Sequence, residues 1–179
     1  MPKVAEDRMR YIFGVVNEFV KFAEAKNLGL IVASTGILTV YFSSNVYHDY
    51  SSGRIFYMGI NFVVFQFITL ILSASSFASR TIVDSKLYGH RNDIGDNVIF
   101  FGHISGKSEK EYLQYFLKET EIDDDSKFLQ DLSHQIVVNS RIASRKFKIF
   151  NISLWTFVAS FITPIGAFLL LNFYLDEAI

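Results

Sequence analysis

Three long apolar stretches constrain this chain more than any other feature. They cover residues 27–48, 55–79 and 149–175, and none of them contains Asp, Glu, Lys or Arg. About 20 predominantly apolar residues in a helix span the roughly 30 Å of bilayer hydrocarbon. The sequence therefore predicts an all-α membrane protein with three transmembrane helices, embedded in a lipid bilayer.

Composition limits what the rest of the chain can do. Half of the 179 residues are apolar, and the net charge is only −1, which gives no reason to expect nucleic acid as a partner. The chain has no cysteine, which excludes disulfides, thiolate zinc sites and cysteine nucleophiles. Only a small soluble part remains, in residues 1–26 and 80–148.

Basic residues indicate the orientation in the membrane. Several precede the first apolar stretch, whereas the connection at 49–54 contains a single arginine. The basic residues beside the first span are Lys3, Arg8, Arg10, Lys21 and Lys26. By the positive-inside rule the N-terminus is cytoplasmic and the C-terminus lies outside. Both soluble parts are then cytoplasmic.

The soluble parts are expected to be helical and continuous with the spans. From Met9 to Ala23 apolar residues recur with a period of 3.6, and no helix breaker follows before the first span. Helix and span then form one rod of about 40 residues, roughly 60 Å long. The same continuity is expected from Phe128 into the third span. The picture is a single domain, 1–179, in which a small cytoplasmic helical stalk joins the first and third spans.

Two local signals organise the segment between the second and third spans. Ser108 and Glu111 form a capping-box pattern that predicts a helix from Glu109 to Glu119. Glycines and polar residues between Tyr88 and Gly106 predict a loop.

Catalytic signatures are lacking. No glycine pattern matches a phosphate-binding loop or a dinucleotide fingerprint, and the four histidines are scattered along the chain. We expect His103 and His134 to be ordinary structural or surface residues rather than metal ligands. The carboxylates at 123–125 are expected to form a solvated face. The sequence therefore predicts no enzyme activity, no catalytic residue, no bound metal and no cofactor.

A basic cluster before the third span allows two interpretations. Arg141, Arg145, Lys146 and Lys148 can attract anionic lipid head groups, or they can form an anion site. Arg141 and Arg145 are four residues apart on one helical face, which suits a phosphate. Lys26 could reach the same depth. Nearby aromatic residues either stack on a ligand base or belong to the core: Tyr112, Tyr115 and Phe116.

Polar side chains inside the spans form the second unusual feature. They are Asn61, Gln66 and Thr69 in the second span, and Asn151, Ser153, Thr156, Ser160 and Thr163 in the third. Such groups usually associate helices within one chain or between copies, and less often line a hydrated path. Pro164 can kink the third span. Three spans cannot enclose a wide path alone, so a pore would require a homo-oligomer.

Several sequence segments resemble the Pycsar effector transmembrane family. They are KFAEAKN at 21–27, FFGHIS at 100–105, EYL at 111–113 and DLSHQIVVNSRIASRKFKIFN at 131–151. The resemblance covers most of the chain and includes the order of amphipathic helix, two spans, cytoplasmic helices and final span. The family-like positions, to which no roles are attached, are Lys26, Asn27, Gln135, Asn139, Ser140 and Lys146.

The resemblance implies an antiviral function. A companion cyclase would make cyclic UMP or cyclic CMP on phage infection, and the effector would then disrupt the bacterial inner membrane, which causes abortive infection. The ligand phosphate would be met by Arg141 and Arg145, with Lys26 or Lys146 as further candidates. The alternative is a membrane scaffold or small oligomeric channel subunit that binds a partner protein and no nucleotide.

Overall fold

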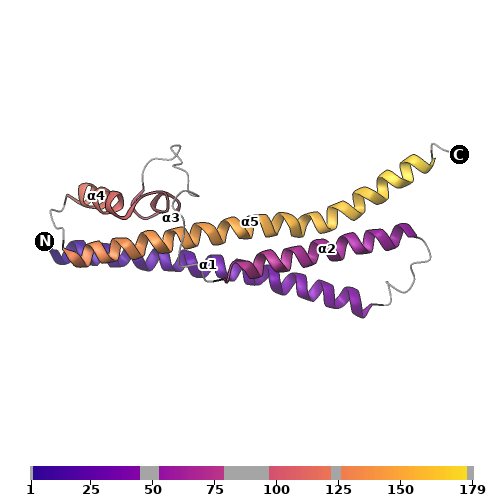
Figure 1. The fold of residues 1–179 in the computed structure, drawn as a ribbon, viewed down its shortest axis with the longest axis horizontal. Helices are drawn as coiled ribbons and strands as arrows, with labels where there is room; N and C mark the ends of the chain where they lie inside the picture. Colours follow the sequence, from indigo (N-terminus) through magenta and orange to yellow (C-terminus); the bar gives the residue numbers. More distant parts are fainter. Residues whose placement is uncertain (1, 45–52, 79–96, 122–125, 177–179) are drawn as a thin grey trace. The chain divides into compact units, whose positions relative to one another are not determined.

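The structure, a computed structural model, describes residues 2–44, 53–78, 97–121 and 126–176, and within these ranges it contains helices and no strand. In chain order the helices are α1 (Pro2–Ser43), α2 (Gly53–Ser75), α3 (Phe101–Ile104), α4 (Glu109–Thr120) and α5 (Lys127–Asp176) (Figure 1). By length and hydropathy α1, α2 and α5 can each cross a membrane. The prediction of an all-α protein with three apolar spans is confirmed.

The chain divides into two compact units. Residues 1–24 and 79–147 form the first, which we call the head unit, and residues 25–78 and 148–179 form the second, which we call the span unit. Helices α1 and α5 each contribute to both units without an interruption in the helix. Several predicted features lie outside the described residues, namely most of the 49–54 connection, the stretch 80–96, and the carboxylates at 123–125.

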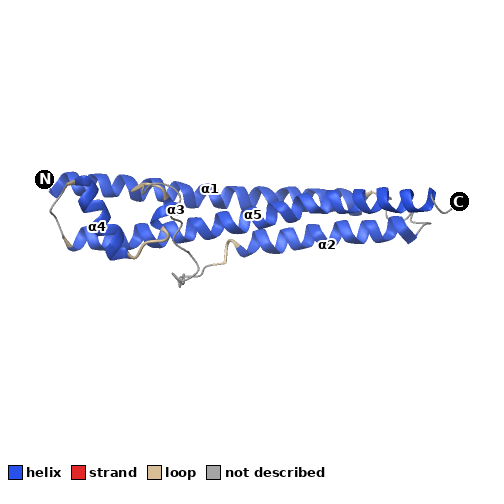
Figure 2. Ribbon diagram, turned by 90° about the horizontal axis from the view of Figure 1, so that it is seen from above, coloured by secondary structure: helices blue, strands red, loops and turns tan. Residues whose placement is uncertain are grey.

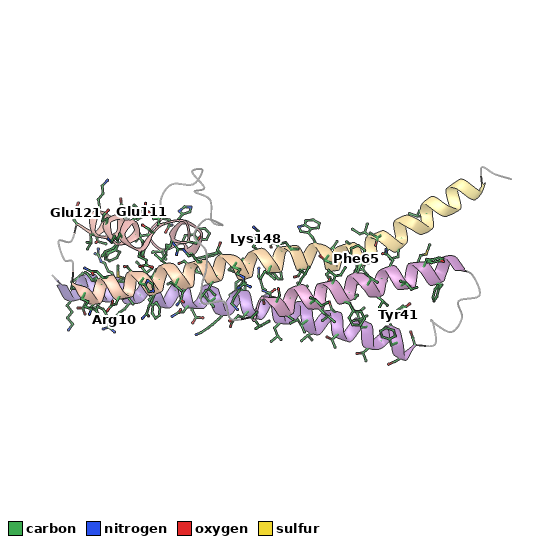
Figure 3. All side chains as sticks on the ribbon, viewed as in Figure 1. Arg10, Tyr41, Phe65, Glu111, Glu121 and Lys148 are labelled. Atoms are coloured by element: carbon green, nitrogen blue, oxygen red, sulfur yellow. The ribbon has the colours of Figure 1, made fainter. Side chains whose placement is uncertain are left out.

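The head unit has an ordinary hydrophobic core. Its buried residues come from α1, α3, α4 and α5, and Figure 2 shows α3 and α4 beside the N-terminal part of α5. The core comprises Ala5, Met9, Ile12, Val16, Ile104, Tyr112, Leu113, Phe116, Leu129, Leu132, Ile136 and Val137. On α1 these positions are three or four residues apart, so the helix turns one continuous stripe toward the core. At the edge of this core the Arg10 guanidinium, labelled in Figure 3, lies 4.7 Å from the centre of the Phe128 ring.

Local signals fix α4, whereas tertiary packing fixes α3. Ser108 caps α4, and its backbone N–H donates to Glu111, labelled in Figure 3, which completes the predicted capping box. The prediction of a loop up to Gly106 is wrong over Phe101–Ile104, where α3 forms. The reason is aromatic packing, since the Phe101 ring centre lies 4.8 Å from that of Phe19 and 5.1 Å from that of Phe147. Neither contact is visible in the local sequence.

In the span unit α1, α2 and α5 pack through aromatic and polar contacts. A chain of rings links the three helices, because Tyr41 lies 5.6 Å from Phe62, and Phe62 lies 5.5 Å from Phe161. Helix α5 changes direction in its C-terminal part, drawn in yellow in Figure 1, and Pro164 stands inside this helix. Proline removes one helical hydrogen bond and crowds the preceding turn, which accounts for the bend.

Candidate functional site

The predicted basic cluster on α5 does not form one open site. Arg141 donates from Nε to the carbonyl of Ser105 at 3.3 Å, and from Nη2 to the carbonyl of Lys107 at 2.9 Å. Both carbonyls lie in the connection between α3 and α4. Arg141 therefore holds α3 and α4 against α5, and two of its donors are already used.

The other members of the cluster have separate surroundings. Lys146 forms an ion pair with Glu24 at 3.0 Å, with only 11% of the lysine side chain exposed. Arg145 is half-buried and Lys148 is exposed, and neither has an ion-pair or hydrogen-bond partner in the described ranges, so both cations are still available to an anion. Lys26 belongs to the span unit, where its ammonium lies 5.0 Å from the centre of the Phe150 ring.

The aromatic candidates for base stacking are mostly core residues. Tyr112 and Phe116 are buried, and the Tyr112 hydroxyl donates to the carbonyl of Val98 at 3.1 Å. Burial raises the pKa of the Tyr112 phenol above its ordinary value. Tyr115 is half-buried, and the Lys107 ammonium lies 4.7 Å from its ring centre. Of the two tyrosines predicted as candidates for base stacking, only Tyr115 is partly exposed to solvent.

A pocket lies in the head unit, where the N-terminal part of α1 meets the C-terminal end of α4. Its volume is about 510 Å³, within the range of about 300–1,000 Å³ common for small-molecule sites. Its lining residues are Asp7, Arg8, Tyr11, Ile12, Val98, Ile99, Phe116, Glu119 and Thr120. The carbonyls held by Arg141 precede the first residue of α4, so the predicted arginine site and this pocket are at opposite ends of that helix.

The lining of this pocket combines an apolar floor with polar groups at its rim. Arg8 and Tyr11 are three residues apart on α1 and so share a face of the helix. The Tyr11 side chain is 65% exposed, and Arg8 has no ion-pair partner among the residues that the structure describes. Asp7 and Glu119 add two hydrogen-bond acceptors. Such a pocket can stack a planar base, bind an anionic group and accept hydrogen bonds from ring N–H groups or hydroxyls.

Sequence analysis does not predict this pocket. There Arg8 indicates only the orientation in the membrane, and Tyr11 is not one of the apolar residues that define the stripe from Met9 to Ala23. Val98 and Glu119 come from segments about ninety or more residues further along the chain. A basic and an aromatic residue three positions apart on the polar side of α1 is the one local signal that could have indicated the site.

Polar residues inside the spans join α2 to α5. Gln66 donates from Nε2 to the Ser160 hydroxyl at 2.9 Å, and Thr163 donates to Asn61 Oδ1 at 2.8 Å. The Thr69 and Thr156 hydroxyls instead donate to carbonyls four residues earlier on their own helices. Asn151 is exposed.

Neither histidine predicted as structural lies in a metal-binding group. His134 pairs through Nδ1 with Glu109, and His103 Nδ1 accepts a hydrogen bond from the backbone N–H of Asn97. Within the described ranges no three His, Asp or Glu side chains are grouped so that they could hold a metal ion.

Comparison with known families identifies the chain. Residues 8–173 match the family described as the Pycsar effector protein domain, a range that includes residues of both units and all three apolar helices. The chain belongs to the Pycsar effector family. It is therefore an anti-phage defence effector and, with its three apolar helices, a membrane protein.

A curated relative is similar to this effector over most of its length. The chain is 29% identical to the Pycsar effector protein SaPycTM of Staphylococcus aureus over 136 residues, which are 75% of each protein. No solved structure matches the chain.

Two of the family-like positions have clear structural partners in this effector. Asn139 donates from Nδ2 to Asn17 Oδ1 at 2.8 Å and so joins α5 to α1, and Lys146 pairs with Glu24. Ser140 and Asn27 are buried, whereas Gln135 is exposed.

Proposed function

We propose that this Pycsar effector binds a cyclic pyrimidine mononucleotide, cyclic UMP or cyclic CMP, and then permeabilises the bacterial inner membrane, which kills the infected cell before phage matures. The observation that carries the proposal is that a single family match includes both a head unit with a ligand-sized pocket and a unit of three apolar spans. One chain thus holds the parts for sensing and for membrane damage. A companion cyclase would supply the nucleotide.

The pocket at Arg8 and Tyr11 is the nucleotide site in this proposal. The Arg8 guanidinium would bind the cyclic phosphate, since arginine suits phosphate geometry. Tyr11 would stack on the pyrimidine, a contact worth about 1–3 kcal/mol per base. Asp7 or Glu119 would accept a hydrogen bond from the base or the ribose.

The arginines of α5 form the competing site. Arg141 has two of its donors on backbone carbonyls, so an incoming phosphate would have to share or displace these bonds. Arg145 alone offers a free guanidinium. Because Arg141 is already engaged, this cluster is a weaker candidate than the Arg8 pocket, whose arginine has no ion-pair partner among the described residues and lines a ligand-sized volume.

Continuous helices provide the route from binding to membrane. Helix α1 carries Arg8 and Tyr11 and continues as a helix to Ser43 in the span unit. A ligand that prefers one packing of α1 against α4 can therefore bias the spans, by as much as its affinities for the two packings differ. The N-terminus would be cytoplasmic and the C-terminus outside, and several copies would assemble to enclose a path.

Dye release from liposomes containing the purified protein tests the proposal. Cyclic UMP or cyclic CMP should cause release, while cyclic AMP, whose purine presents a different set of hydrogen-bonding groups to Asp7 and Glu119, should not. Release that is independent of every cyclic nucleotide, or no release at all, would contradict the proposed function.

Binding measurements on variants separate the two sites. Arg8→Ala and Tyr11→Ala should each weaken binding about tenfold or more, as expected for the loss of about 1–3 kcal/mol. Arg145→Ala, which removes a cation of the competing site, should bind like the wild type. If Arg145→Ala weakens binding whereas Arg8→Ala and Tyr11→Ala do not, the nucleotide binds at α5 instead.

A further inference from the structure

Each span of the span unit buries a pair of polar residues seven positions apart, and α2 also buries Thr69 between its pair. The pairs are Asn27 and Ser34 on α1, Gln66 and Ser73 on α2, and Ser153 and Ser160 on α5, and all six side chains have 0% exposure. Seven residues make two helical turns, or about 10.5 Å, so each helix presents its pair on one face. We call these six residues the polar seam.

Four oxygen atoms of the polar seam have no hydrogen-bond partner. They are the hydroxyls of Ser34, Ser73 and Ser153, together with Gln66 Oε1, and each is buried within the part of the chain that the structure describes. Three other hydroxyls of the span unit behave differently. Thr39, Ser75 and Thr156 each donate to a carbonyl three or four residues earlier on the same helix.

This contrast argues against a purely structural role. A hydroxyl in a membrane helix can donate a hydrogen bond to a backbone carbonyl of the same helix. A serine whose role is only to allow close packing would form this bond. An unsatisfied polar group in hydrocarbon costs free energy, and an apolar residue of the same size would avoid that cost. The seam keeps such groups on all three helices, which indicates a state in which they meet water.

The strongest polar contact of the seam lies beside the proline of α5. Gln66 donates to the Ser160 hydroxyl at 2.9 Å, and that hydroxyl donates to the Phe157 carbonyl at 2.6 Å. Pro164 has no N–H, so the helical bond to the Ser160 carbonyl cannot form. A hydrogen bond between α2 and α5 and a weakened turn of α5 thus coincide, so α5 can bend at the place where the two helices are joined.

The outer surface of the span unit is apolar and suits lipid rather than water. Val32, Ile71 and Trp155 are 64%, 68% and 72% exposed, one from each helix. In a single unit the six residues of the polar seam are therefore hidden from lipid and from water. To place the seam in water, the spans must turn toward neighbouring copies.

We propose that the polar seam lines a path for water and small inorganic ions when several copies of the effector assemble. This inference rests on the proposed membrane disruption, and it names the residues past which water and ions would move. In the closed unit the seam faces inward, and in the assembly α2 and α5 separate so that seams of adjacent copies face a shared path. The seam carries amides and hydroxyls and no charged group, so the path discriminates little between small cations and anions.

Cysteine labelling in liposomes tests the seam directly, because the natural chain contains no cysteine. Ser73→Cys and Ser153→Cys are near-isosteric, and matched lipid-facing controls are Ile71→Cys and Trp155→Cys. A charged, membrane-impermeant thiosulfonate should modify the seam cysteines at least tenfold faster when cyclic UMP or cyclic CMP opens the liposomes, and should reduce the ion flux. The lipid-facing cysteines should not change. Equal rates at seam and lipid positions during leakage would overturn the inference while leaving the proposed function intact.

A charged variant tests the seam without any nucleotide. Gln66→Glu places a carboxylate in the closed interior, which disfavours that state and favours one in which residue 66 meets water. We expect Gln66→Glu to leak without nucleotide and to favour cations, whereas Ile68→Glu, on the exposed side of α2, should not leak. If nucleotides fail to open wild-type liposomes but Gln66→Glu leaks, the proposed trigger is wrong and the seam stands. A Gln66→Glu protein that stays tight, or is rejected by the membrane, overturns the seam.

Discussion

The head unit and the span unit bury opposite kinds of side chain. In the head unit the core is apolar, with Leu129 and Ile136 fully buried, whereas the buried residues described in the span unit are polar except for Leu30 and Leu38. In water, burial of apolar surface lowers the free energy of the folded state. Lipid tails are as apolar as leucine, so this driving force is absent in the bilayer. The difference shows that the kind of side chain buried in each unit depends on whether water or lipid surrounds that unit.

Helix α1 contains both patterns in one register. Its buried residues recur at spacings of three, four or seven, from Met9, Ile12 and Val16 in the head unit to Asn27, Leu30 and Ser34 in the span unit. The buried residues lie on one face of α1 along its length. Only their side chains change, from apolar groups in the head unit to an amide and a hydroxyl beside leucines in the span unit. A single helical period therefore organises two units with opposite interiors.

Two leucines of α5 give the largest expected difference between the units. Leu129 is fully buried in the head unit, and Leu169 is 62% exposed in the span unit. Leu129→Ala should cost about 2–5 kcal/mol, because it removes buried methyl groups and leaves a cavity. Leu169→Ala should cost under about 1 kcal/mol in detergent, where micelle contacts replace those of lipid. Thermal unfolding of the detergent-solubilised protein measures both, and equal losses would mean that Leu169 contributes as much to stability from the lipid-facing surface as Leu129 does from the core.

Periodicity was enough to predict the helices but not their contacts. The stripe from Met9 to Ala23 and the capping box at Ser108 depend on neighbours within four residues, so they are legible in the sequence. Helix α3 was missed because Phe101 owes its place to Phe19 and Phe147, far away in the chain. Here contacts with distant residues form a helix in a segment whose local sequence is typical of a loop.

The site residues show the same limit. Arg141 and Lys146 are basic residues next to a span, and the sequence alone could not show that one holds backbone carbonyls and the other pairs with Glu24. Arg8 belongs to a pocket only because Val98 and Glu119 are brought to it. Partners more than about thirty residues apart leave no local signature in the sequence. Whether any of these residues binds a nucleotide stays a prediction.

The ion pair of Lys146 and Glu24 should have an effect of intermediate size. Lys146→Met removes a buried cation and leaves Glu24 without its partner, while the 42% exposure of Glu24 lets water compensate part of the loss. We expect destabilisation of about 1–2 kcal/mol, below the roughly 3–5 kcal/mol of fully buried pairs. The double variant Glu24→Gln with Lys146→Met should recover much of it in a double-mutant cycle. Additive losses would show that the two charges do not interact.

The smallest effect on stability should come from Ser73 in the polar seam. Its hydroxyl is buried without a hydrogen-bond partner among the described residues, so Ser73→Ala removes an unsatisfied group rather than a bond. Polar contacts between membrane helices average only about 0.6 kcal/mol, which limits the loss even if the hydroxyl finds a partner in the bilayer. We expect the melting temperature in detergent to stay unchanged or to rise slightly, while nucleotide-dependent ion flux falls. Ser75→Ala is the matched control, since that hydroxyl already donates to the Leu72 carbonyl of its own helix, and it should leave the flux unchanged. A loss of stability above about 1 kcal/mol in Ser73→Ala would mean that the hydroxyl holds the closed bundle together, and the polar interior would then serve packing, as the apolar interior does in the head unit.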